Sequence, residues 1–388
     1  FGFFLISDDT LLMLLEGLIA FFVGSIPFSK FNQSLGQLSF DEKAKLYNMK
    51  AMSAFIFVMG VICFLFSLLT LIRQGVSLDQ FDETTSSLSG GLLSHLKLVG
   101  LSVVPITMYY GIRQRNFIAL SGTALIFVSV FLSFTKYNII CPVAASIIFI
   151  GLSSQKAERR TIAALLIIPI SLFIINYVVG FALRGTSSNV SSSFYGNHLW
   201  TYLGGSLIYD NYIFSVGIRV GQGTLDKVLI FLFAFPNMII NRLFGIRFFE
   251  HQKQPHLPIS HGIERANVVD AIGYLYPSQG KIVDIMVFIV VMLYIGFIFS
   301  ILVRIMLHHA KNRFNTTLPF FLAEFVLMSF FGTFYINPGP WEQLIYCALV
   351  PSLFLNRKLI SEHMQGTIGP VSEAKRCSPP VYERLNDA

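Results

Sequence analysis

The chain has 388 residues, of which 54% are hydrophobic and only 13% charged, with a mean hydropathy of +0.65 and a net charge of +7. Soluble globular domains carry about 25% charged residues, so this composition excludes an ordinary soluble protein. It indicates an all-α polytopic membrane protein, because helices satisfy their own backbone polar groups inside a bilayer.

Nine apolar windows are long enough to be read as membrane spans. In chain order they lie near residues 10–28, 51–72, 93–111, 117–134, 138–153, 162–182, 283–307, 318–335 and 341–356. They predict four parts: an N-terminal transmembrane bundle over 1–182, a large external loop over 183–282, C-terminal transmembrane helices over 283–356 and a flexible tail over 357–388.

The Lys and Arg residues are distributed unevenly between alternate connections. Most of the 28 lie in segments 29–50, 112–116, 154–161, 304–317 and 357–388. The positive-inside rule predicts that these segments, including the C-terminus, are cytoplasmic. The long segment then faces outward, into the periplasm of a bacterial inner membrane. This alternation leaves Phe1 outside, so a further helix upstream is expected.

The long segment is dense in polar chemistry. Residues 183–281 hold eight Lys and Arg, five Asp and Glu, and four of the eight His. Long loops of this kind usually carry binding or catalytic groups, so we expect the function here. Within it, Val228–Ile240 is apolar but too short to span comfortably. A re-entrant or interfacial helix fits this stretch, and a buried helix in a folded loop is the alternative.

Three groups of residues in this segment are candidates for binding and catalysis. The first begins at Arg184 and continues through Trp200, Tyr202, Gly204 and Asp210. Aromatic faces suit sugar rings, and glycine allows close approach of a ligand to the backbone. Trp and Tyr are also the usual residues of the membrane interface, and Arg184 has the alternative role of a lipid phosphate anchor.

The second group is basic, and the third contains histidines. The basic residues are Arg242, Arg247, Lys253, Arg265 and Lys281. The guanidinium fork matches phosphate oxygens, which suits a lipid-linked pyrophosphate, and general attraction to anionic headgroups is the alternative. The third group is His251, His256 and His261 with Glu250 and Glu264, which are candidate proton acceptors. The spacing of the histidines and the absence of a cofactor motif argue against a metal or cofactor.

Four ionisable residues fall inside or at the ends of the predicted spans: Glu16, Lys97, Lys136 and Glu324. Such groups are costly in a bilayer unless they are paired or face water. We expect Lys136 to face the outer cavity. Glu324 is the most deeply placed acid, of the type that a transporter uses as a proton relay.

Two stretches of the long segment resemble a known family. They are Arg184-Gly185 followed by the run from Trp200 to Ser206, and Ala266–Ala271 with Tyr274, Tyr276 and Gly280. Together they resemble the bacterial oligosaccharide repeat-unit polymerases, the Wzy-type O-antigen and capsule polymerases. The chain departs from the family at Ser278-Gln279-Gly280, where an Asp-Phe-Gly-like triplet is expected.

The resemblance implies a membrane glycosyltransferase (GT-C-like) architecture and a metal-independent reaction without a cofactor. The enzyme would transfer a growing glycan from undecaprenyl pyrophosphate to a new lipid-linked repeat unit, with a chain-length regulator protein as a further partner and no nucleic acid. In this interpretation Arg184 and Arg265 act on the leaving pyrophosphate, and His261 or Glu264 is the base. The implied substrate-binding residues are Arg242, Arg247, Tyr202, Gly204, Asp210, Asn267 and Lys136.

Two other functions remain open. An O-antigen ligase uses the same donor, but such ligases have a His-Asn pair where this chain has Ala266-Asn267. A lipid-linked oligosaccharide flippase is the alternative from another class. A flippase should show short loops and charges inside its spans, whereas this chain has one long charged outer loop and no evident two-fold repeat.

Overall fold

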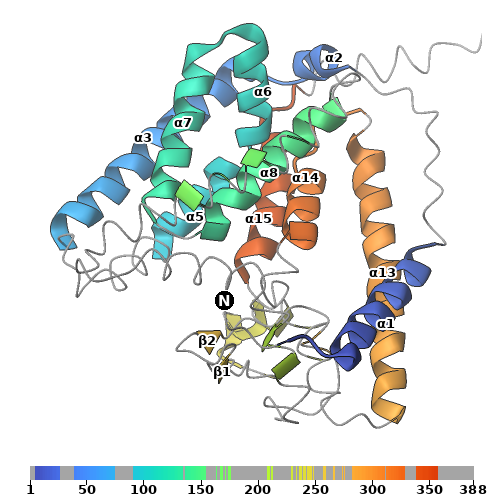
Figure 1. The fold of residues 1–388 in the computed structure, drawn as a ribbon. Coiled ribbons are helices and arrows are strands. Elements are labelled where there is room, and N and C mark those ends of the chain that lie inside the picture. Colours follow the sequence, from blue (N-terminus) through green and yellow to red (C-terminus); the bar gives the residue numbers. More distant parts are fainter. Residues whose placement is uncertain are drawn as a thin grey trace, which may run out of the picture.

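The structure of the protein is a computed structural model. It describes residues 5–26, 39–74, 91–133, 136–153, 282–310, 312–327 and 338–356, with single residues and short pieces between 163 and 275. The described part is mostly helical and contains one small pair of strands. Figure 1 shows a bundle of helices, with a crossed pair of helices beside it and the strand pair near one end.

Helices occupy eight of the nine predicted windows, and the window at 162–182 lies largely outside the described residues. The helices are α1 (Asp8–Ser25), α2 (Phe40–Lys45), α3 (Met49–Gln74), α5 (Gly91–Leu101), α6 (Val104–Gln114), α7 (Phe117–Phe131), α8 (Lys136–Ser153), α13 (Ile282–Ala310), α14 (Thr317–Leu322), the π-helical turn η3 (Ala323–Leu327), α15 (Pro338–Leu349) and the 3-10 turn η5 (Pro351–Phe354). The strands are β1 (Leu257–Pro258) and β2 (Arg265–Ala266).

Capping side chains determine where several helices begin. Ser7 caps α1, and Ser39 with Glu42 forms a reciprocal capping box at α2. The Asn116 side chain accepts a hydrogen bond from the Ala119 N–H at 3.0 Å and begins α7. These contacts satisfy N–H groups that have no partner within the first helical turn, so they fix the ends of the connections as well as the helices.

The span predicted over 93–111 is a bent pair of helices rather than one straight helix. The axes of α5 and α6 meet at 46°. Pro105 lies in the first turn of α6, where it has no N–H to donate and its ring excludes the carbonyl of Leu101, four residues earlier. The break at Ser102 and Val103 therefore has a local cause in the sequence.

The described helices support a membrane-embedded protein. Met49–Arg73 and Ile285–Ala310 are long and apolar enough to cross a bilayer, and α5 with α6 makes a third span if the bent pair counts as one. Phe117–Phe131 and Ile139–Ser153 are apolar but shorter. The helical membrane class is therefore confirmed, while the number of nine spans stays a prediction.

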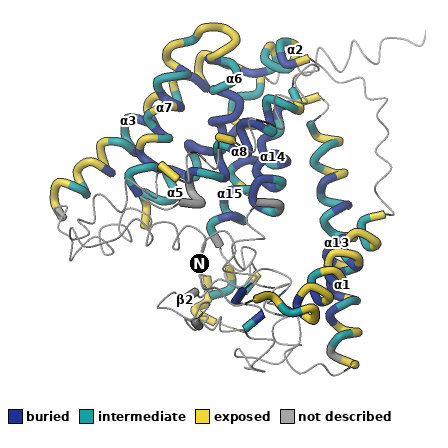
Figure 2. Tube along the Cα trace, in the orientation of Figure 1, coloured by how far each residue is buried: buried dark blue, intermediate teal, exposed yellow. Residues whose placement is uncertain are grey.

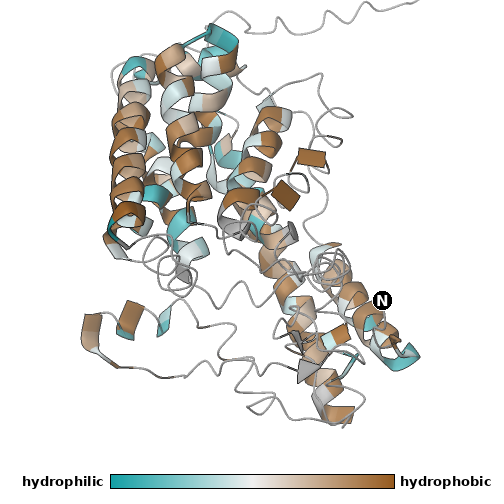
Figure 3. Ribbon diagram, turned by 60° about the vertical axis from the view of Figure 1, so that its left-hand side comes forward, coloured by the Kyte–Doolittle hydropathy of each residue, from teal (hydrophilic) through white to brown (hydrophobic). Residues whose placement is uncertain are grey.

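The bundle has a buried centre and an apolar outer surface. Its largest buried cluster joins α3, α5, α6, α7, α8, α14 and α15 and includes Ile56, Ile126 and Phe320. Exposed residues run along α1 and α3 (Figure 2), and the helices are mainly hydrophobic while their ends are more polar (Figure 3). Phe22 and Phe66 are among the exposed aromatic residues. An exposed apolar surface of this kind suits contact with lipid chains.

Close helix crossings in the bundle depend on small residues. A Cβ at Gly122 of α7 would lie 2.6 Å from the backbone N of Phe57 in α3. Hydroxyl groups link the same helices where Ser67 and Ser129 lie 3.1 Å apart. Lipid chains give no hydrophobic drive for helix association, so close packing and interhelical hydrogen bonds supply the attraction.

The pair of α1 and α13 crosses in the same way beside the bundle (Figure 1). A Cβ at Gly24 would lie 2.0 Å from the carbonyl oxygen of Leu293, and one at Gly296 would lie 2.0 Å from that of Phe21. The two backbones are therefore in direct contact. Ser300 adds a hydrogen bond by donating to the Ser25 carbonyl at 3.1 Å.

The basic connections meet at one end of the molecule. Lys43 of α2 donates to the Ala310 carbonyl at the end of α13, and Asp41 pairs with Arg113 at the end of α6. Tyr47 accepts a hydrogen bond from the Phe314 N–H at 3.1 Å. Three of the segments predicted to share the cytoplasmic side therefore lie together, as the predicted alternation of spans requires.

Reporter fusions test the orientation itself. We expect fusions at Lys156 and Asn312 to report a cytoplasmic position and a fusion near Asn189 to report an external one, because of the unequal distribution of Lys and Arg between the connections. Paired phosphatase and fluorescent-protein reporters measure this directly. A cytoplasmic result near Asn189 would reject the topology and the external site.

Tyr47 is buried where these segments meet, and burial raises the pKa of its phenol to about 12. An unfolded phenol ionises near pH ~10, so between this value and about 12 the unfolded chain loses the proton first and stability falls as pH rises.

Tyr47→Phe should cost about 1 kcal/mol at neutral pH through the lost hydrogen bonds. It should also lessen the fall in stability between the two pKa values. Thermal unfolding at neutral and alkaline pH measures both effects, with half-buried Tyr110→Phe as the control.

Candidate functional site

Most of the predicted site lies outside the residues that the structure describes. These residues are His261, Glu264, Arg184, Arg242, Arg247, Tyr202, Gly204, Asp210 and Asn267. Arg265 and Lys136 are described through their backbones: Arg265 begins β2, and Lys136 begins α8. Their chemical roles stay predictions.

The two strands connect the ends of the histidine-containing stretch. β1 and β2 are antiparallel, with Leu257 opposite Ala266 and Pro258 opposite Arg265. His261 and Glu264 fall between the strands in sequence. The pairing fixes the backbone at Pro258 and Arg265, while residues 259–264 lie outside the described part of the chain.

A second piece of the long segment packs on the first turn of α1. The side-chain oxygen of Asn211 accepts hydrogen bonds from the Ser7 N–H at 2.8 Å and the Thr10 hydroxyl at 2.9 Å. Its amide nitrogen donates to the Leu5 carbonyl at 2.9 Å. Asn211 is 5% exposed and neighbouring Tyr209 is fully buried. Asn211 thus joins the stretch that contains Asp210 to the start of α1, a positioning role that its sequence context alone does not reveal.

A polar contact between two helices was not predicted. His95 of α5 pairs with the carboxylate of Glu342 in α15, and Tyr346 donates to the same carboxylate oxygen at 2.8 Å. The positions of His95 and Glu342 near the starts of their windows are the only sequence signal. Their pairing depends on the packing of helices that are far apart in the chain.

The most buried acidic group among the described residues lies in an irregular turn. Glu324 belongs to the π-helical turn η3 and is 5% exposed. Its Oε2 has no hydrogen-bond partner among the described protein groups. It lies within electrostatic range of the Cys141 and Cys347 thiols, on α8 and α15. The prediction that Glu324 is deeply placed is confirmed, and π-helical turns are frequent at functional sites.

Further polar groups surround Cys347 beside this acid. Thr316 donates its hydroxyl to the Cys347 carbonyl at 3.2 Å, and the Gln343 amide nitrogen donates to the Cys347 sulfur at 3.3 Å. The buried Gln343 Oε1 has no hydrogen-bond partner among the described protein groups. Glu324 and Gln343 therefore each offer a buried acceptor oxygen near Cys347. The carboxylate of Glu324 can take up a proton, and the amide oxygen of Gln343 can accept a hydrogen bond.

Lys97 is a buried cation on α5. It is 5% exposed on α5 and lies within electrostatic range of the Cys63 thiol on α3. The described residues contain no group of three or more His, Cys, Asp or Glu placed to hold a metal ion. The predicted histidine cluster of residues 251–261 lies largely outside that search.

Comparison with known proteins defines the family of the chain. No curated protein and no solved structure matches it. A family model described as "Family of unknown function (DUF6337)" matches residues 3–361. This match includes the bundle, the long segment and the last described helix. The chain therefore belongs to the DUF6337 family.

Proposed function

We propose that the protein is a membrane glycosyltransferase that polymerises undecaprenyl-pyrophosphate-linked oligosaccharide repeat units. The reaction takes place at the outer face of the bacterial inner membrane and produces O-antigen or capsular polysaccharide. The observation that carries the proposal is the long polar segment 183–282 between apolar windows, which holds eight Lys and Arg, five Asp and Glu, and four of the eight His. Within this segment Asn211 is held by hydrogen bonds to the start of α1.

The chemistry follows from the leaving group. An acceptor sugar hydroxyl attacks the anomeric carbon of the donor glycan, and the bond from that carbon to the pyrophosphate oxygen breaks. Negative charge grows on the lipid pyrophosphate, which Arg184 and Arg265 stabilise through guanidinium hydrogen bonds. The hydroxyl proton passes to His261 or Glu264. Arg242 and Arg247 hold the pyrophosphate, while Tyr202, Gly204, Asp210, Asn267 and Lys136 line the sugar path.

Deletion of the gene in its own bacterium tests the class of reaction. We expect the ladder of long surface polysaccharide to disappear from gels while a band with one repeat unit remains. Loss of every band on the lipid A core would identify a ligase instead. A deletion strain that makes the same ladder as its parent, with no further change when the gene is returned on a plasmid, would reject the proposal.

A transporter of lipid-linked oligosaccharides is the second candidate, and Glu324 is the observation that favours it. A buried carboxylate inside a membrane helix commonly serves a proton relay. The π-helical turn and the acceptor oxygen of Gln343 provide a polar environment between helices. Transport would use protonation of this site to drive the lipid-linked substrate across the bilayer.

Glu324→Gln separates the two candidates. In a glycosyltransferase it should preserve polymerisation, because the amide keeps the shape of the carboxyl group and the transfer reaction needs no proton relay at this position. In a proton-driven transporter it should stop translocation of labelled lipid-linked oligosaccharide in proteoliposomes. Asp9→Asn, at an exposed carboxylate in the first turn of α1, is the control.

A further inference from the structure

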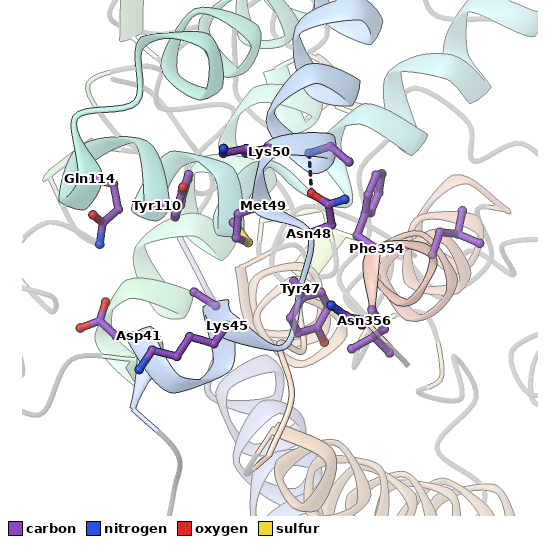
Figure 4. Close-up of a pocket in the computed structure, with 14 residues that line it drawn as sticks. Asp41, Lys45, Tyr47, Asn48, Met49, Lys50, Tyr110, Gln114, Phe354 and Asn356 are labelled. Atoms are coloured by element: carbon purple, nitrogen blue, oxygen red, sulfur yellow. Dashed lines mark hydrogen bonds between the residues drawn. The ribbon is translucent and has the colours of Figure 1, made fainter. Parts of the chain in front are cut away.

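A second candidate binding region lies at the basic end of the molecule, apart from the long segment. A cavity of about 840 Å³ is lined by α2, the start of α3, the end of α6 and residues 353–356. Figure 4 shows Lys45 and Lys50 extending toward one side of this pocket, with Tyr110 and Gln114 between them. The volume is that of a small-molecule site, and the side chains at its mouth are polar.

Backbone contacts hold the walls of the pocket together. The Asn48 N–H donates to the Phe354 carbonyl, and the Asn356 N–H donates to the Leu46 carbonyl, both at 2.8 Å. Between these bonds Tyr47 and Leu355 form a β-bridge. The connection from α2 to α3 is therefore fastened to the chain that follows α15. A pocket with such a frame needs little reorganisation to bind a ligand.

The charge of the pocket is positive. Lys45 and Lys50 are exposed at its rim, and neither forms an ion pair with a residue in the part of the chain that the structure describes. The lining carboxylate of Asp41 is already paired with Arg113. The charge that remains available to a ligand thus comes from two ammonium groups.

The start of α3 adds the positive end of a helix dipole to these charges. Asn48 caps the helix by accepting a hydrogen bond from the Ala51 N–H at 3.1 Å, and residues 48–51 line the pocket. The helix that begins here continues for 26 residues, so the positive end of its dipole lies at the pocket. Gln114, Asn356 and Tyr110 also line the pocket, and their amide and hydroxyl groups can donate hydrogen bonds.

We propose that this pocket binds a phosphate-bearing anion, which is either the phosphodiester of an anionic phospholipid headgroup or a soluble phosphate compound. Two ammonium groups and the start of a long helix match the charge and the oxygen acceptors of such a group. The predicted topology places the pocket on the cytoplasmic side, level with the ends of the membrane helices. The site is separate from the proposed transfer reaction and does not depend on it.

Two binding measurements on the full-length protein test the site and identify the source of the phosphate. In the first, native mass spectrometry counts phosphatidylglycerol molecules retained by protein released from nanodiscs, with phosphatidylcholine as the neutral comparison. In the second, calorimetry measures the binding of inorganic pyrophosphate and glycerol phosphate in a neutral detergent. If phosphatidylglycerol is retained but neither soluble phosphate binds, the ligand is a lipid headgroup. If pyrophosphate or glycerol phosphate binds, the ligand is a soluble compound.

The variant K45Q/K50Q should weaken the observed binding about tenfold or more, because it removes two charge-assisted contacts. K45R/K50R should keep binding near the original level. The control R73Q/R115Q removes two exposed positive charges outside the pocket, one of them at the far end of α3. Equal binding by the glutamine variant and the control in both measurements, or no binding in either, would overturn the proposal.

Discussion

Replacing Gly122 by leucine is expected to force α3 and α7 apart and to prevent correct assembly of the bundle. A Cβ at this position would lie 2.6 Å from the Phe57 nitrogen and 2.7 Å from the Ile56 carbonyl carbon. Both atoms belong to the α3 backbone, which cannot rotate aside as a side chain can. Overpacking of a core costs about 1–3 kcal/mol when side chains can adjust, so a backbone clash should cost more.

Size-exclusion chromatography and thermal unfolding in detergent measure this effect. Separation of the helices should also break the contact between Ser67 and Ser129, which adds to the loss. Ala124→Leu is the matched control, because Ala124 is an exposed residue of the same helix. A Gly122→Leu protein that is as monodisperse and as stable as the control would show that this crossing does not hold the bundle together.

Arg184→Ala and Arg265→Ala are each expected to lower the rate of polymerisation about a hundredfold, which corresponds to about 3 kcal/mol of lost transition-state stabilisation. In the proposed mechanism, each substitution removes a guanidinium from the leaving pyrophosphate. Arg184→Lys should restore little activity, because an ammonium group lacks the planar fork. The rate is measured as polymer length against time with protein inserted at normal levels.

The control for the arginine variants is Arg73→Ala at the end of α3, which removes an exposed positive charge outside the long segment. This variant should polymerise normally. Long polymer at the original rate from both Arg184→Ala and Arg265→Ala would reject the role of these residues in stabilising the pyrophosphate.

The positions of the helices could be predicted from the sequence because a membrane span is a continuous run of apolar residues. Met49–Gln74 and Ile282–Ala310 both correspond to predicted windows, with ends displaced by a few residues. The bend between α5 and α6 was missed although Pro105 provides a signal for it. Hydropathy averages over the window and therefore hides a single residue that interrupts the backbone hydrogen bonds.

Contacts between distant helices could not be predicted in the same way. Nothing in the sequence around His95 identifies Glu342 as its partner, because the contact depends on how α5 and α15 pack. The basic-end pocket has the same origin, since α2 and residues 353–356 are far apart in the chain. Glu324 was recognised as an acid in an apolar window, but its π-helical turn is a property of the folded backbone.

The predicted catalytic residues rest on chemistry rather than on periodicity. Arg184, His261, Glu264 and Arg265 were chosen from residue type and from resemblance, and a long polar segment has no regular pattern that predicts which side chains converge. The β1–β2 pairing joins the two sides of the stretch that contains His261 and Glu264. Measurements of activity must therefore assign the base.

Base assignment requires a comparison of His261→Ala and Glu264→Gln with the unmodified protein. If either side chain takes the proton from the hydroxyl of the acceptor sugar, its replacement should lower turnover about a hundredfold or more while donor binding is unchanged. Near-normal turnover in both variants would move the search for the base to Asp210, His198 or Asp270.

Polymer formation by the purified protein tests the proposed function most directly. The full chain would be reconstituted in proteoliposomes with a synthetic undecaprenyl-pyrophosphate-linked repeat unit, and the products separated by size. We expect a ladder of glycans that lengthens by whole repeat units with time, together with release of undecaprenyl pyrophosphate, in the presence of a metal chelator. Substrate that remains a single repeat unit but moves to the opposite leaflet would contradict the account and identify a transporter.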